Sequence, residues 1–339
     1  AVEVLDYALL SAPGAPLKQA LLDVKAGKDV YGSYDDGILQ PYFTVIAKGS
    51  NPDRKEEFVS VIRQVLGDIV KNGIDRKAVE AGINYFEFRY READFSSYPK
   101  GLMYSLDILG DWLYEKGNPF AQVQQLTVFE KLKKAVNEGY FEELIQKYLL
   151  DNTHGSIVII KPERGRTARM DAELDEKLQA YKASLSSEEV DALVARTKAL
   201  EAYQSAPESP EVLEKIPVLR REDISREITP ISNEELKLAG VPVIFHEIET
   251  NGIGYADILF DISGVSEEML PYVGILQSVL GIIDTENYEY GELFNEINVY
   301  TGGIGTSLEL YNDVTDVENK SFKATFEIKT KALYDPLKV

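Results

Sequence analysis

Apolar positions between Leu39 and Met103 follow first a strand pattern and then a helix pattern. The β-branched and aromatic run Leu39–Lys48 predicts a buried strand. Apolar residues then recur at spacings of three and four, which puts them on one face of a helix: Phe58, Val61, Ile62, Val65, Leu66, Ile69 and Val70. Gly73 is expected to end that helix, and Asp75 to cap a second helix from about Arg76 to Arg91. A strand followed by two long helices predicts an α/β layer whose apolar faces pack on a sheet.

The residues on either side extend this layer. Val4, Leu5, Ala8 and Leu9 indicate a short helix, and the turn Ser11–Pro16 precedes another. Val30–Tyr34 predicts a strand that a turn joins to the Leu39 strand. The β-branched run Ile157–Ile160 is expected to be the closing strand of this part of the chain.

Composition changes after Arg166. Residues 166–205 are charged throughout, contain almost no aromatic residues and show no strand pattern. Ser186, with Glu189 three positions later, forms a capping box that predicts the start of a second helix here. The segment is therefore expected to be an antiparallel helical hairpin, followed by an extended linker with prolines at positions 207, 210 and 217.

A second α/β pattern begins near Ile228. Ile253–Asp261 predicts a strand, and Ser266 is expected to cap a helix. A further helix is expected from near Tyr290. Two last strands, Thr306–Tyr311 and Phe322–Ile328, are expected to pair with each other.

Overall composition narrows the classes of function. The chain has 339 residues, 44% of them hydrophobic and 27% charged, which fits a soluble globular protein of roughly two domains. The formal net charge of −21 argues against nucleic-acid or anionic-membrane partners. The absence of cysteine excludes disulfides and thiolate zinc sites. No apolar run approaches the roughly 18 residues that span a membrane. The N-terminus shows no cleavage signal, and we expect a chain cut from a longer one, here called the parent chain.

Motifs that carry chemistry are few. The only histidines, His154 and His246, are too far apart to form a zinc motif, so no catalytic residue and no metal ligand is assigned. The glycines of the segment 302–305 lack the lysine of a phosphate-binding loop and predict a turn that enters a strand. Arg89 and Arg91 with Glu92 predict an ion network on a helix surface, with peptide anchoring as a less favoured alternative.

Several motifs, taken together, resemble the second domain of presequence-protease-type zinc metallopeptidases of the pitrilysin/insulysin superfamily. The resemblance covers nearly the whole chain and keeps the family's order of elements. It is carried by the segments LQPYFTVIAKG (39–49), AVEA (78–81), SYPKGL (97–102), NPF (118–120) and YLLDNTH (148–154). The family's inverted zinc motif, H-x-x-E-H, is absent from this sequence.

The resemblance implies two pitrilysin/insulysin-type α/β domains, both incomplete, joined by the helical hairpin. Residues 1–165 would form the second peptidase-like domain, residues 166–228 a hinge, and residues 229–339 the start of a third domain. The implied function is the noncatalytic central part of a zinc metalloendopeptidase that degrades unfolded peptides in a closed clamshell chamber. Zinc would be bound by the parent chain and not by these residues.

The resemblance also implies partners and a location. The partners are peptide substrates and the remaining domains of the parent chain, and the location is cytoplasmic in a bacterium or organellar in a eukaryote. In related insulysin-type enzymes an exosite binds substrate N-termini, and Gly14 and Gln40 are its nearest positional matches here. An exposed sheet edge can hold an extended peptide there, although a plain turn and strand remain the favoured interpretation. The alternative for the whole chain is a noncatalytic structural or peptide-binding member of the same superfamily.

Overall fold

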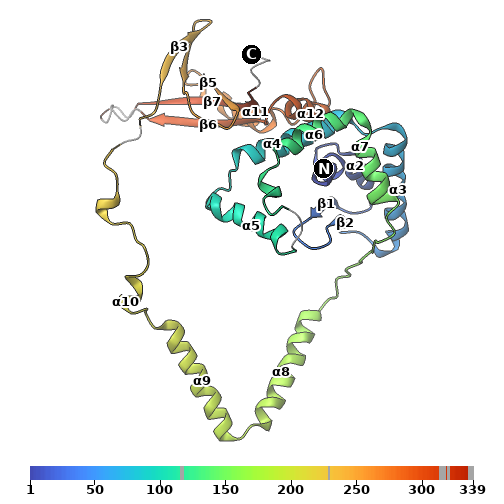
Figure 1. Cartoon of the computed structure of the whole chain (residues 1–339), viewed down its shortest axis with the longest axis vertical. Coiled ribbons are helices and arrows are strands. Elements are labelled where there is room, and N and C mark those ends of the chain that lie inside the picture. The colour runs from blue at the N-terminus through green and yellow to red at the C-terminus, as the bar shows by residue number, and fades with distance from the viewer. Residues whose placement is uncertain (115–117, 228–229, 313–317, 319–320, 335–339) are drawn as a thin grey trace. The chain divides into compact units, whose positions relative to one another are not determined.

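The computed structural model contains both helices and strands, as the sequence predicted (Figure 1). It describes residues 1–114, 118–227, 230–312, 318 and 321–334. The chain divides into two compact units, Ala1–Ile157 with Glu249–Val339 and Val158–Ile248. The three-part division at residues 165 and 228 stays a prediction, and residues 228 and 229 lie outside the described residues.

The first unit begins with short helices and a β-hairpin. These elements are α1 (Val2–Asp6), a π-helical turn (Tyr7–Ser11), α2 (Pro16–Asp23), β1 (Asp29–Asp35) and β2 (Tyr42–Lys48). The strands pair antiparallel from Asp29 opposite Lys48 to Asp35 opposite Tyr42. The predicted Leu39 strand therefore begins three residues later than expected. Pro41 has no N–H to donate, so the ladder cannot continue through it as a regular strand.

Two long helices follow, as predicted. They are α3 (Lys55–Asn72) and α4 (Arg76–Glu92). Gly73 ends α3 with a φ of 95°, a backbone conformation that favours glycine. Asp75 caps α4, because its Oδ1 accepts hydrogen bonds from the backbone N–H of Lys77 at 2.9 Å and of Ala78 at 3.3 Å.

Further helices complete a buried core in this unit. They are α5 (Lys100–Trp112), α6 (Leu126–Ala135), α7 (Tyr140–Leu144), a π-helical segment (Ile145–Leu150) and 3-10 turns at Pro52–Arg54, Ala121–Val123 and Val136–Glu138. Leu9 and Leu17 from the N-terminal helices pack in one cluster with Val79, Ile83 and Phe141. α4 thus holds the N-terminal elements and the later helices around one core.

The same unit contains a three-stranded sheet from the C-terminal part of the chain. Its elements are β5 (Ile253–Asp261), a 3-10 turn (Glu267–Met269), α11 (Leu270–Val279), α12 (Tyr290–Tyr300), β6 (Ile304–Asn312) and β7 (Phe322–Leu333). The strand order is β5-β7-β6, with both neighbouring pairs antiparallel. The predicted pairing of the last two strands is confirmed. Ser266 occupies the N-cap position but makes no side-chain capping bond.

The second unit holds the predicted helices. Its elements are α8 (Arg166–Ser184), α9 (Ser187–Ser205), α10 (Pro210–Leu213), a 3-10 turn (Arg221–Asp223), β3 (Glu234–Leu238) and β4 (Val241–Phe245). The capping box is confirmed: Glu189 N–H donates to Ser186 Oγ at 3.2 Å, and Ser186 N–H donates to Glu189 Oε2 at 2.8 Å. The stripe residues Leu174 and Leu178 are exposed, and α8 and α9 diverge from the turn that joins them (Figure 1).

The predicted closing strand at Ile157–Ile160 is wrong. These residues have no regular secondary structure, and their side chains are 44% to 90% exposed. A β-branched run forms a stable strand only beside a hydrogen-bonding neighbour, and in the described sheets β1 pairs only with β2. Among the described residues, no helix combines the length and the apolar character needed to cross a membrane.

Candidate functional site

The exposed side of α4 carries polar groups that meet the C-terminal part of the same unit. α4 packs along α12, so residues far apart in the sequence lie side by side (Figure 1). Asn84 Nδ2 donates to the Val299 carbonyl oxygen at 2.6 Å, and Lys77 forms an ion pair with Glu296. The helix that organises the first core therefore also holds the second α/β segment.

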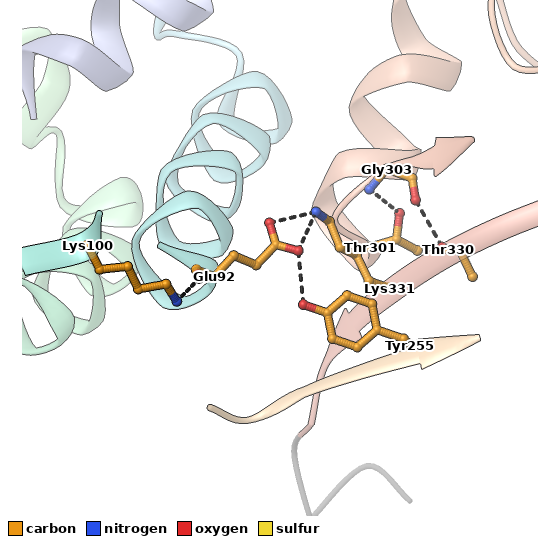
Figure 2. A network of polar contacts seen from close by, with 7 residues as sticks. All are labelled: Glu92, Lys100, Tyr255, Thr301, Gly303, Thr330 and Lys331. Carbon is orange, nitrogen blue, oxygen red and sulfur yellow. Dashed lines mark hydrogen bonds and ion pairs between the residues drawn. The ribbon is translucent and has the colours of Figure 1, made fainter. Parts of the chain in front are cut away.

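Glu92, the last residue of α4, is the centre of a polar network (Figure 2). Lys331 Nζ lies 2.7 Å from each Glu92 carboxylate oxygen, and the Tyr255 hydroxyl donates to Oε1 at 3.0 Å. Lys100 Nζ donates to the Glu92 carbonyl oxygen at 3.2 Å. The Glu92 and Lys331 side chains are only 19% and 27% exposed, so water screens this ion pair less than a pair on the open surface.

The network extends to both neighbouring loops. Arg91 Nη1 donates to the Asn251 carbonyl oxygen, and Asn251 Nδ2 donates to the Arg91 carbonyl oxygen, each at 3.0 Å. Burial, reinforced by the hydrogen bond to Glu92, raises the pKa of the Tyr255 phenol. Tyr255 therefore stays a hydrogen-bond donor to Glu92 at neutral pH.

Gly302 brings the entry of β6 close to α4. Its N–H donates to the Lys331 carbonyl oxygen at 2.7 Å. A Cβ at this position would lie 2.7 Å from Lys331 Cγ and 2.9 Å from Phe88 Cδ1, so a larger residue would force these groups apart. Thr330 Oγ1 donates to the Gly303 carbonyl oxygen at 3.0 Å (Figure 2). The prediction that this glycine segment is a turn entering a strand is confirmed.

The predicted ion network at the end of α4 is confirmed, but its reach was missed. Arg91 pairs with Glu87 at 2.7 Å on its own helix, and Arg89 lies over the Tyr85 ring at 5.7 Å. The contacts of Glu92 with Lys331 and Tyr255 cross more than 160 positions of sequence. Periodicity reports only neighbours on one element, so it carried no signal for these contacts.

The two predicted exosite residues lie in different surroundings. Gly14 has a φ of 74° and lies against the start of α12, where a Cβ at Gly291 would be 3.3 Å from the Pro13 carbonyl oxygen. Gln40 lies in the loop before β2, and its Nε2 is 3.0 Å from His154 Nδ1. Each residue therefore contacts a separate part of the first unit. A role for either in peptide binding stays a prediction.

The histidines have structural neighbours. His154 N–H donates to Asn152 Oδ1 at 2.8 Å, and its ring meets Gln40. His246, expected on a strand, lies just after β4, with Nδ1 3.3 Å from the Ser232 carbonyl oxygen. In the part of the chain that the structure describes, no three histidine, aspartate or glutamate side chains form a group that could hold a metal ion. These residues do not fit the zinc site that the resemblance implies for the parent chain.

Comparison with known proteins assigns the family. A family model for the region associated with subfamily C of the M16 peptidases matches residues 160–338, which is more than half of the chain. The chain belongs to this peptidase-associated family. It is 40% identical over 98% of its length to protein HypA of Clostridium perfringens. It is 30% identical over 90% to presequence protease 1, chloroplastic/mitochondrial, of Arabidopsis thaliana. It is 27% identical over 94% to the mitochondrial presequence protease of Danio rerio.

These matches confirm the resemblance to presequence proteases and show what share of them is covered. This peptidase-associated chain spans 34%, 28% and 31% of the three relatives, about a third of each. The match is nearly continuous along this chain. It includes α4 and the strand that carries Lys331, the two elements that the Glu92 network joins.

Proposed function

We propose that this chain is the noncatalytic central part of a zinc metalloendopeptidase that degrades unfolded peptides in a closed clamshell chamber. The observation that carries the proposal is its similarity to presequence proteases over 90% or more of its length, but only about a third of theirs. The described residues hold no cluster suited to zinc. Zinc and the catalytic groups would therefore belong to the remaining domains of the parent chain.

In this proposal residues 1–165 and 229–339 belong to two incomplete peptidase-like domains, with residues 166–228 as the hinge. The contacts of α4 with α12 and β7 are then where the two domains meet. Exposed helices without buried residues, such as α8 and α9, suit a segment that links domains and does not build a core. The polar character of the α4 contacts suits an interface that can open.

The relatives suggest the substrates and the location. The Arabidopsis and Danio proteins are named for presequence cleavage and for chloroplasts or mitochondria. We assign unfolded peptides as the substrates, with an organellar location in a eukaryote or a cytoplasmic one in a bacterium. Gly14 and Gln40 remain candidates for contact with a peptide.

Metal analysis of the dialysed chain, with a fluorogenic-peptide assay, tests the noncatalytic assignment. We expect no stoichiometric zinc and no turnover, because zinc needs three or four nitrogen, sulfur or oxygen ligands in a near-tetrahedral array. A His154→Ala, His246→Ala double variant is the matched control and should show the same zinc content. One equivalent of bound zinc, or turnover that a chelator abolishes, would contradict the assignment.

A further inference from the structure

A cavity of about 430 Å³ lies in the first unit beside the C-terminal half of α4. This volume is in the range of about 300–1,000 Å³ typical of ligand pockets. Four half-buried aromatic side chains contribute to its lining: Phe86, Tyr90, Phe95 and Tyr104. Phe95 and Tyr104 meet edge to face, with ring centroids 5.6 Å apart. The cavity therefore offers aromatic surface to an entering side chain.

Carboxylates from three separate segments line the same cavity. Glu3 comes from α1, Asp36 from the loop after β1, and Asp107 from α5. All three are accessible to solvent, and none forms an ion pair within 4.0 Å among the residues that the structure describes. Their negative charges converge without a bound cation to offset them.

The carboxylates influence one another through the cavity. Partial burial raises the pKa of Glu3, and the nearby Asp36 raises it further. Partial burial and Asp36 raise the pKa of Asp107 in the same order. Two positive groups oppose this effect at Glu3, the α-amino group of Ala1 and the Arg89 guanidinium, and Arg89 also lies over the Tyr85 ring. A cation placed between these carboxylates would relieve their repulsion.

The combination of aromatic faces and convergent carboxylates selects the ligand's chemistry. A guanidinium or ammonium group gains from both: it is attracted to aromatic faces and forms charge-assisted hydrogen bonds with carboxylates. Its apolar stem can lie along the aromatic wall while its charged head reaches the carboxylates. An anionic group would be repelled, and a neutral apolar group would cost the carboxylates their hydration.

We propose that this cavity binds the cationic side chain of an arginine or lysine presented by a peptide. The proposal rests on the proposed function only in taking a peptide as the ligand. The cavity would position a peptide through one basic residue, away from the zinc centre of the parent chain.

Fluorescence anisotropy with two short alanine peptides tests the site, using this chain and a neutral dye. One peptide carries a central arginine and the other carries citrulline, which has nearly the same shape without the charge. We expect the arginine peptide to bind about tenfold more tightly. Asp36→Asn and Asp107→Asn should each remove most of that preference and leave citrulline binding unchanged. Asp53→Asn, an exposed carboxylate outside the cavity, is the matched control and should change neither affinity.

The asparagine variants should fold, because each removes a mutually repelling charge, and thermal unfolding checks this. Equal affinity for both peptides, no binding of either, or an arginine preference that survives both substitutions would overturn the proposal. The test reads binding alone, without zinc or turnover. A failure here is therefore distinguishable from a failure of the proposed peptidase function, which the metal and activity assays report.

Discussion

Replacing Glu92 with lysine should lower the free energy of unfolding of the first unit by about 2 kcal/mol. This value lies between the roughly 0–1 kcal/mol of exposed ion pairs and the 3–5 kcal/mol lost when one member of a buried pair is removed. The variant removes the acceptor for Lys331 Nζ and the Tyr255 hydroxyl, and it places two ammonium groups together. Urea denaturation measures the change.

The matched control and the rescue make the Glu92 result specific. Glu56→Lys changes an exposed carboxylate that lies 3.6 Å from Lys55 and should cost less than about 0.5 kcal/mol. Adding Lys331→Glu to Glu92→Lys restores opposite charges and should recover most of the loss. A Glu92→Lys variant as stable as the Glu56→Lys control, or a double variant without recovery, would show that the network does not hold the two segments together.

Substituting Gly32 with alanine should destabilise the first unit by about 3 kcal/mol, at the upper end of overpacking effects. Gly32 lies in β1, and a Cβ there would overlap Asp6 Oδ1 and Leu10 Cδ1 and lie 3.2 Å from the Thr44 carbonyl oxygen. Leu10 is in the buried core and the Thr44 carbonyl belongs to the backbone, so neither can give way easily.

Gly67→Ala is the matched control for this substitution, and its sign should be opposite. Gly67 lies within α3, and no atom lies within 4 Å of a Cβ built there. Alanine favours a helix over glycine, so stability should rise by about 0.5–1 kcal/mol. Denaturation curves of both variants decide the matter. A Gly32→Ala protein as stable as the original would mean that the N-terminal helix does not pack on the hairpin as described.

Local chemistry made much of the fold predictable from the sequence. The Asp75 cap, the Ser186 capping box and the glycine that ends α3 each depend on residues within a few positions, and all three are confirmed. The pairing of β6 with β7 followed from two apolar runs close together in the chain. Predictions of this kind need no knowledge of the rest of the molecule.

Features that depend on distant neighbours were not predictable in the same way. Ile157–Ile160 has the composition of a strand, but no described strand pairs with it. The helical stripe at Leu174 and Leu178 meets no partner face and stays exposed. The candidate site showed the same limit, because Glu92 was recognised as part of a charged helix end, whereas Lys331 carried no local signal. The cavity lining comes from α1, α4 and α5, and no pattern in the sequence links these three helices.

Turnover of a fluorogenic peptide by a reconstituted parent chain tests the central claim most directly. This chain, the rest of the parent chain, and their mixture would be assayed at equal concentrations, with and without a zinc chelator. The account predicts no turnover from this chain, little from the remainder, and chelator-sensitive turnover from the mixture, since the middle part must join the domains that hold zinc. Turnover by this chain alone, or full turnover by the remainder without it, would contradict the account.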